Sequence, residues 1–226
     1  MKDQQIQQQI TSFKDVLVVK NFLSMRQIRI TEEMLDVGQW STSSKNNKQN
    51  DDGTFYKWMP LLQEYSKNPK NADFNILDAL DIRITNILLE HATKDPQNKQ
   101  LYVKNCGIFS SSVSTAYYAD NSYPIDSENR IIALGHPLQE GFHCEKNLDE
   151  IKTWKIRDGF DDLRYSCFIF LNDDFVGGGL VFPQIKVEIK PERNTLVVFP
   201  STPDYIHGER PVSGVKNCFC SWYGSK

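Results

Sequence analysis

The hydrophobic positions of this 226-residue chain change their spacing at Leu101. Before that point, apolar residues recur every three to four positions in Met25–Val37 and Ile76–His91, the spacing of one helix face. A shorter helix is predicted over Met59–Tyr65, and the run Asp15–Lys20 has the β-branched composition of a strand. These patterns predict a first part in which helices predominate.

From Leu101 onward, apolar residues gather in short runs bounded by turn residues, which is typical of β structure. The predicted strands are Leu101–Phe109, Val113–Asp120, Arg164–Asn172, Leu180–Phe182, Ile185–Lys190, Thr195–Phe199, Tyr205–His207 and Lys216–Tyr223. Helices followed by many short strands predict an antiparallel sheet structure, a jelly roll or barrel, with helices packed on one side.

The length of the chain suits one domain with a single substantial core. We expect residues 1–100 to form a helical support region and residues 101–226 to form the β core. Residues 121–162 are polar with little periodicity, so we expect an insertion or lid there. Residues 41–53 contain no apolar side chain and predict an exposed loop.

Charge and composition exclude several classes of protein. The formal net charge of −3 gives no electrostatic reason to expect a nucleic-acid partner, and no apolar run is long enough to span a membrane. The glutamine-rich start lacks the apolar core of a secretory signal, so we expect a cytoplasmic protein or one whose signal has been removed. The five cysteines form no CxxC pair and no zinc spacing, which favours reduced thiols.

The segment from Arg164 to Pro183 joins a buried strand, an acidic turn and three glycines that permit a tight reversal into a second strand. It is followed by IKPERNTLVVFPS (189–201) and YIHGERPVSGVK (205–216). This order of motifs over Tyr117–Tyr223, about half of the chain, resembles the catalytic domain of prolyl 4-hydroxylases and leprecan-type prolyl 3-hydroxylases. Those enzymes are iron(II)/2-oxoglutarate-dependent oxygenases. The resemblance implies a double-stranded β-helix, the cupin-like jelly roll.

In that family a His-x-Asp pair and a distant histidine hold the metal ion. The matching segment here is YYADNS (117–122), in which Asp120 corresponds to the carboxylate ligand and Tyr118 replaces the first histidine. His207 corresponds to the distant histidine. Side chains two residues apart on a strand point to the same face, so both can reach one metal ion. Two imidazoles and a carboxylate leave three coordination positions of that ion for 2-oxoglutarate and dioxygen. The resemblance therefore implies Asp120 and His207 as catalytic metal ligands.

Lys216 lies nine positions after His207, where the family has the Arg or Lys that pairs with the far carboxylate of 2-oxoglutarate. A buried ammonium needs an anionic partner, and we expect the cosubstrate to supply it. Two features depart from the family: Phe170 replaces a tyrosine that often hydrogen-bonds 2-oxoglutarate, and Ile108–Val113 lacks a Tyr-Gly-x-Gly pattern. The pocket is thus expected to keep its cation and lose hydroxyl donors.

The replacement at Tyr118 has three interpretations. Tyr118 is a phenolate ligand; or it is a spectator while Asp120 and His207 hold the metal, with His136 or His143 as a substitute ligand; or it marks a site that no longer binds iron. The leading hypothesis is an iron(II)/2-oxoglutarate-dependent dioxygenase that hydroxylates a prolyl peptide, an amino acid or a small metabolite. The competing hypothesis is a binding or scaffold protein on the same fold with a degenerate metal site.

Overall fold

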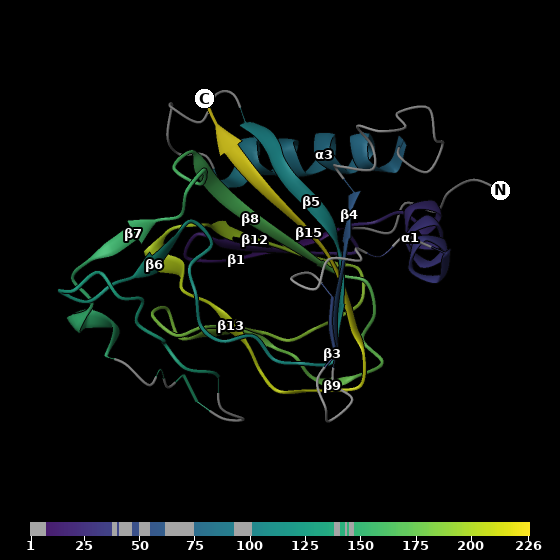
Figure 1. The fold of residues 1–226 in the computed structure, drawn as a ribbon. Helices are drawn as coiled ribbons and strands as arrows, with labels where there is room; N and C mark the ends of the chain where they lie inside the picture. Colours follow the sequence, from purple (N-terminus) through teal and green to yellow (C-terminus); the bar gives the residue numbers. More distant parts are fainter. Residues whose placement is uncertain are drawn as a thin grey trace.

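The computed structural model describes residues 8–37, 40, 47–49, 55–61, 75–92, 101–137, 141–142, 144 and 147–226. Its main element is an antiparallel sheet of eight strands in the order β1-β2-β12-β8-β15-β5-β4-β3 (Figure 1). In chain order these are β1 (Gln9–Phe13), β2 (Val16–Lys20), β3 (Asn47–Gln49), β4 (Phe55–Pro60), β5 (Leu101–Ser111), β8 (Leu163–Phe170), β12 (Thr195–Pro200) and β15 (Lys216–Ser225).

Shorter strands form the second layer. One small sheet has the order β11-β10-β13, and two pairs of strands, β14-β9 and β6-β7, complete it. Their bounds are β6 (Ser122–Pro124), β7 (Trp154–Ile156), β9 (Val176–Gly177), β10 (Leu180–Phe182), β11 (Val187–Ile189), β13 (Gly208–Glu209) and β14 (Val212–Ser213). Two 3-10 turns, Leu148–Glu150 and Pro203–Tyr205, lie among them. This two-layered antiparallel arrangement is the predicted double-stranded β-helix.

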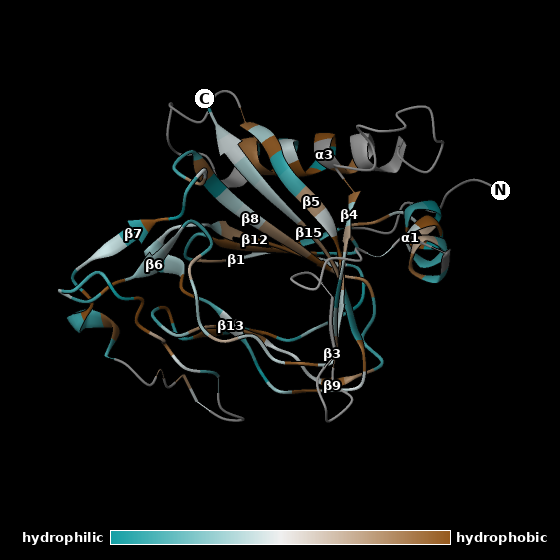
Figure 2. Cartoon of the chain, in the orientation of Figure 1, coloured by the Kyte–Doolittle hydropathy of each residue, from teal (hydrophilic) through white to brown (hydrophobic). Residues whose placement is uncertain are grey.

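Strict alternation along the strands of the large sheet produces two cores, one on each face. On β12, Val197 and Phe199 point into the barrel, whereas Leu196 and Val198 point to the opposite face. The barrel interior also contains Phe168 and Phe170 of β8, Cys218 and Cys220 of β15, and Leu180 and Phe182 of β10. Figure 2 shows hydrophobic residues where the strands of the large sheet converge. Polar side chains on the interior register therefore lie in a largely apolar barrel.

The outer face of the large sheet is covered by helices α1 (Met25–Val37) and α3 (Asn75–Ile87), the latter continued by the π-helical turn η2 (Leu88–Ala92). Ile84 and Leu88 are fully buried against this face, together with Ile28 of α1. Figure 1 shows α3 running across the sheet on the side away from the small strands. Both long helices were predicted from their apolar spacing, and both are confirmed. No helix within the described ranges has the length and apolar content needed to cross a membrane.

The first hundred residues also supply strands β1 to β4 to the large sheet, so this region does more than provide helical support. The expected strand over Asp15–Lys20 is confirmed as β2. The helix expected over Met59–Tyr65 is wrong at its start, because Met59 and Pro60 extend β4 and pair with β5. Residues 62–65 lie outside the described part, as does most of the loop expected at 41–53.

Two predicted strands are absent. Residues 113–120 make only one isolated bridge, Tyr118 to His207, because their other backbone hydrogen bonds go to unrelated partners such as Gly135 and Glu209. Tyr205–His207 is not a strand because a 3-10 turn with Pro203 at its start ends at Tyr205. Both segments nevertheless carry residues predicted for the site, and the bridge joins them.

Candidate active site

The segment Tyr117–Asp120 presents alternate side chains to opposite sides, as its extended backbone requires. Tyr117 and Ala119 pack into a small outer cluster with Leu134. Tyr118 and Asp120 therefore point the other way, toward the barrel interior, where both approach His207. The predicted same-face relation of positions 118 and 120 holds, although the segment is not a regular strand.

Asp120 is buried and its carboxylate is held at both oxygens. Ser166 of β8 donates to Oδ2 at 2.6 Å, and the indole Nε1 of Trp222 donates to Oδ1 at 3.0 Å. The Ser166 hydroxyl also lies 2.7 Å from the Ser201 hydroxyl. Such outer contacts orient a carboxylate without using all its lone pairs, so Asp120 remains able to bind a cation.

His207 is 1% exposed and has its imidazole enclosed by aromatic rings. Ring centroids of Tyr118, Phe199, Phe182 and Phe168 lie 4.4, 4.6, 5.9 and 6.1 Å from it. Its Nδ1 lies 3.1 Å from the carbonyl oxygen of Tyr205, which assigns a ring proton to Nδ1 because a carbonyl only accepts. The other ring nitrogen, Nε2, then faces Asp120, whose Oδ2 is 3.5 Å away.

A metal ion fits between these two groups as far as ligand chemistry is concerned. The Nε2 atom is buried and has no hydrogen-bond partner among the described residues, an arrangement that a bound cation satisfies. The part of the chain that the structure describes contains no group of three or more His, Cys, Asp and Glu ligands. His136 is exposed and does not complete the pair, and His143 lies outside the described residues. Among the described residues, Asp120 and His207 are thus the two candidate ligands that the structure brings together.

Tyr118 occupies the position where the family resemblance places a histidine, and its ring packs on the imidazole of His207. Burial around its hydroxyl, and then the negative charges of Asp120 and Glu209, raise the pKa of Tyr118 well above its ordinary value. The side chain is therefore a neutral phenol in this structure. The spectator interpretation fits this environment better than the phenolate interpretation does.

Lys216 begins β15 and is completely buried in the barrel interior, two positions before Cys218 on the same face. The predicted anionic partner of Lys216 was the cosubstrate, but the chain supplies one itself. The carboxylate of Glu209, on β13, forms a close ion pair with the ammonium group. Burial lowers the pKa of Lys216, but Glu209 together with Cys218 and Cys220 raises it by more, so that the net pKa is raised. Lys216 also lies over the Phe109 ring, 5.2 Å from its centroid.

Tyr56 is a polar residue of this interior that the sequence did not reveal. It is paired across β4 and β5 with Ser111, which in turn is paired with Lys216, so the three positions form one row. Burial, and then the charges of Cys220 and Glu209, raise the pKa of Tyr56. Phe170 is buried as an apolar side chain, as expected, but the pocket regains a hydroxyl from Tyr56. Only pairing of distant strands brings it there.

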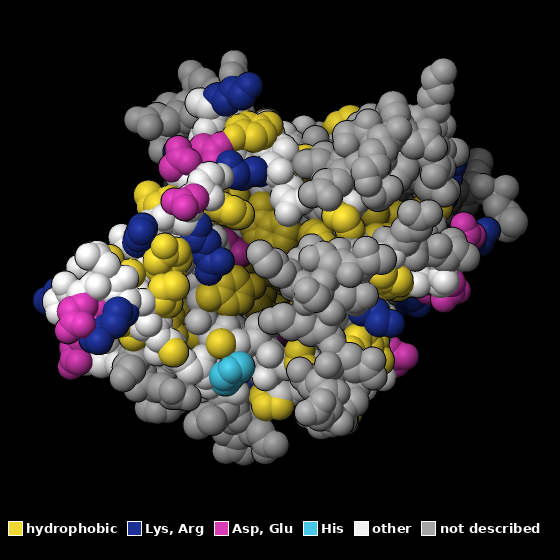
Figure 3. Space-filling model, viewed as in Figure 1, with side chains coloured by type: hydrophobic (Ala, Val, Ile, Leu, Met, Phe, Trp, Pro, Cys, Tyr) yellow, Lys and Arg dark blue, Asp and Glu magenta, His cyan; other side chains and the backbone are white. Residues whose placement is uncertain are grey.

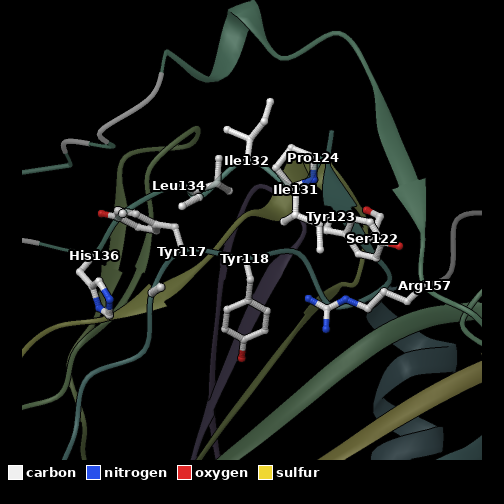
Figure 4. Close-up of a pocket in the computed structure, with 13 residues that line it drawn as sticks. Tyr117, Tyr118, Ser122, Tyr123, Pro124, Ile131, Ile132, Leu134, His136 and Arg157 are labelled. Carbon is white, nitrogen blue, oxygen red and sulfur yellow. The ribbon is translucent and has the colours of Figure 1, made fainter. Parts of the chain in front are cut away.

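A cavity of about 360 Å³ opens beside Tyr118. Its walls come from residues 116–118 and from the predicted insertion, and they include Tyr123, Leu134 and Arg157. In Figure 4 the Tyr118 phenol lies between the Arg157 guanidinium and His136. The Arg157 Nε is buried and makes no hydrogen bond to any described residue. On the face of the molecule that Figure 3 draws, basic side chains lie beside a hollow with hydrophobic side chains.

Comparison with known proteins gives matches over the second half of the chain. Residues 133–224 match the family model of the 2OG-Fe(II) oxygenase superfamily, a range that includes His207 and Lys216 but not Tyr118 or Asp120. The chain is 28% identical over 90 residues to human prolyl 3-hydroxylase 2 and 30% identical over 90 residues to mouse prolyl 3-hydroxylase 3. Each match covers 38% of this chain, but only 13% and 12% of the respective relatives.

Solved structures share the fold over nearly the whole chain. The viral collagen prolyl hydroxylase vCPH of Paramecium Bursaria Chlorella virus-1, in its 2-oxoglutarate complex, has a TM-score of 0.56 at 14% identity and covers 94% of this chain and 97% of its own. HygX of Streptomyces hygroscopicus, with nickel, 2-oxoglutarate and hygromycin B bound, has a TM-score of 0.56 at 12% identity, covering 95% of this chain and 84% of its own. The chain thus has the double-stranded β-helix and a domain that resembles the 2OG-Fe(II) oxygenases of the prolyl-hydroxylase kind.

Proposed function

We propose that this chain is an iron(II)- and 2-oxoglutarate-dependent oxygenase. The observation that carries the proposal is the buried pair of His207 and Asp120. An imidazole Nε2 without a partner among the described residues lies 3.5 Å from a carboxylate oxygen, inside an apolar barrel. A buried ring nitrogen without a hydrogen-bond partner is costly, and a cation between it and the carboxylate would satisfy both. The match of residues 133–224 to the 2OG-Fe(II) oxygenase superfamily supports iron(II) as that cation.

Asp120 and His207 are the residues that would hold the metal ion. Ser166 and Trp222 orient the carboxylate, and the Tyr205 carbonyl keeps the proton on Nδ1 so that Nε2 is free to coordinate. Phe182 and Phe199 exclude water from one side of the imidazole. When bound, iron(II) would supply the oxidising chemistry, in which dioxygen, 2-oxoglutarate and a substrate C–H bond are converted to succinate, carbon dioxide and a C–OH group.

Lys216 is the residue that would bind the far carboxylate of 2-oxoglutarate, because it is a fully buried cation in the same interior as the metal ligands. Tyr56 adds a neutral hydroxyl on the same row. Tyr118, as a neutral phenol, would stay outside the ligand set, and its ring, tilted by 57° to the imidazole, covers one side of His207.

The substrate enters, in this proposal, through the cavity beside Tyr118. Its aromatic and aliphatic walls suit an apolar ring such as that of proline. The Nε of Arg157, which has no hydrogen-bond partner among the described residues, suits a carbonyl or carboxylate oxygen next to that ring. The likeness to prolyl hydroxylases supports a peptide substrate, and the likeness to HygX with hygromycin B supports a small molecule. We favour the prolyl peptide.

The test separates metal binding from turnover. Mn(II) binding is followed by electron paramagnetic resonance, and succinate formation is followed with iron(II), 2-oxoglutarate and a panel of prolyl peptides. We expect Asp120→Ala and His207→Ala to remove both signals. Asp173→Asn, which changes an exposed carboxylate of a turn, and His136→Ala are the matched controls and should leave metal binding intact.

Two outcomes would contradict the proposal. Absence of Mn(II) binding by the unaltered protein would leave the competing hypothesis, a binding or scaffold protein on this fold. Metal binding that persists in the His207→Ala variant would show that the ligands lie elsewhere in the chain.

A further inference from the structure

The ion pair between Lys216 and Glu209 has a consequence for cosubstrate binding. Both side chains are buried, with 0% and 6% of the side chain exposed. Lys216 has one carboxylate oxygen beside it, and the other oxygen of Glu209, Oε2, has no hydrogen-bond partner among the described residues. The cation that the proposed function assigns to 2-oxoglutarate is therefore already neutralised by the chain.

We propose that Glu209 is an internal competitor of the cosubstrate: its carboxylate occupies the position on Lys216 that the far carboxylate of a five-carbon dicarboxylate must take. This inference rests on the proposed function, since it concerns the same site. Two carboxylates on one buried ammonium repel each other, because little water screens them. Binding of 2-oxoglutarate thus requires Glu209 to leave Lys216.

The backbone keeps Glu209 close to Lys216. The Glu209 amide donates to the Thr115 carbonyl oxygen at 3.1 Å, and β13 pairs with β10 through Glu209 and Leu180. On the other side, Lys216 is fixed by its pairing with Ser111 of β5. A carboxylate tethered in this way has a high effective concentration at the ammonium group, whereas the cosubstrate must arrive from solution.

Two neighbours line the Lys216 side chain. A Cβ placed at Gly178 would lie 3.4 Å from Cδ of Lys216, so the aliphatic stem passes close to the backbone there. The Phe109 ring covers the ammonium on another side. Displacement of Glu209 is therefore the simplest way to admit a second carboxylate.

The experiment compares two ligands of equal chain length in two proteins. Binding of 2-oxoglutarate and of 2-oxopentanoate, which has a methyl group in place of the far carboxylate, is measured by calorimetry with Mn(II) and without oxygen. Glu209→Gln keeps the size of the side chain and removes its charge. We expect this variant to bind 2-oxoglutarate about tenfold more tightly or better, since a desolvated charge competitor is lost. Binding of 2-oxopentanoate should stay within about twofold, because that ligand does not compete for the ammonium.

Three controls make the result specific. Glu188→Gln neutralises a carboxylate of the same small sheet that pairs with Arg210 instead, and it should leave both affinities unchanged. Glu209→Gln combined with Lys216→Met should lose the gain. Glu209→Ala should reproduce it, and circular dichroism confirms that each variant is folded.

An unchanged or weaker 2-oxoglutarate affinity in both Glu209 variants would overturn the inference, as would an equal gain for the two ligands. Failure of the proposed function looks different. In that case neither the unaltered protein nor the Glu209 variants would form succinate, whatever their affinities for the dicarboxylate. A protein that turns over 2-oxoglutarate with a KM insensitive to Glu209 would retain the function and lose this inference.

Discussion

Two polar clusters of the barrel interior differ in whether neighbouring side chains satisfy their hydrogen-bonding groups and charges. At one, His207 points its Nε2 toward Asp120 at 3.5 Å and has no hydrogen-bond partner for it in the described part of the chain. At the other, the charge of Lys216 is balanced by Glu209. The first cluster can bind a ligand without losing an existing contact, whereas a ligand of Lys216 must displace the Glu209 carboxylate. Residue identity alone does not distinguish these cases.

The largest effect, on the free energy of unfolding, is expected when the Lys216–Glu209 ion pair is broken. Lys216→Met leaves Glu209 as an unpaired buried charge, which should lower the free energy of unfolding by about 3–5 kcal/mol. Replacing both residues, Lys216→Met with Glu209→Leu, should recover most of that loss. Urea denaturation measures both changes.

The matched control is Lys20→Met, because Lys20 pairs with Glu192 at the surface, where 43% and 51% of the two side chains are exposed. It should change stability by less than about 1 kcal/mol. Equal losses of unfolding free energy in Lys216→Met and Lys20→Met would contradict the expectation that a buried, unpaired Glu209 destabilises the fold.

The next effect concerns the unsatisfied cluster. Ser166→Ala removes the hydroxyl that donates to Asp120 Oδ2 at 2.6 Å, and should weaken Mn(II) binding by about 10- to 100-fold. Ser221→Ala is the control, since Ser221 is also buried and its hydroxyl has no hydrogen-bond partner among the described residues. If the two variants bind Mn(II) equally well, Asp120 is not the metal-binding carboxylate.

Tyr118→His tests whether the two-ligand cluster is incomplete. One more imidazole on the same face should strengthen Mn(II) binding by about tenfold or more, because it adds a ligand that suits divalent metals. Tyr118→Phe should change binding only within about twofold, as expected of a spectator. A marked loss of Mn(II) binding in the Phe variant would instead identify the phenol oxygen as a ligand.

The smallest effect on stability near neutral pH is expected from the Cys218 thiol, which lies in the field of Lys216 and Glu209. Burial raises the pKa of Cys218 from 9.0 to about 12, with Lys216 lowering it and Glu209 raising it to smaller extents. Because the unfolded thiol ionises first, stability should be unaffected below pH 9 and should fall between pH 9 and pH 12. The expected slope is at most about 1.4 kcal/mol per pH unit for this thiol.

Unfolding at several pH values, compared between the unaltered protein and Cys218→Ala, measures this contribution. The variant should lack that part of the slope. Iodoacetamide at pH 8 should modify Cys218 only after unfolding, and rapid modification of the folded protein would contradict the burial of the thiol.

The sequence by itself determined the class of fold and most of its regular elements. The apolar spacing of Met25–Val37 and the strand runs after Leu101 reflect local periodicity, which a single chain displays directly. The order of motifs pointed to Asp120, His207 and Lys216, and the structure brings the first two within 3.5 Å. Their role as ligands remains a proposal.

Only the tertiary structure decided which partners these residues have. Glu209 was unremarkable in sequence, and its pairing with Lys216 arises because β13 packs opposite the start of β15. Tyr56 reaches the same interior through the β4–β5 pairing, and the predicted strand at 113–120 is replaced by a segment with scattered backbone partners. Local pattern specifies which face of a strand a side chain occupies, whereas long-range packing specifies what that side chain meets there.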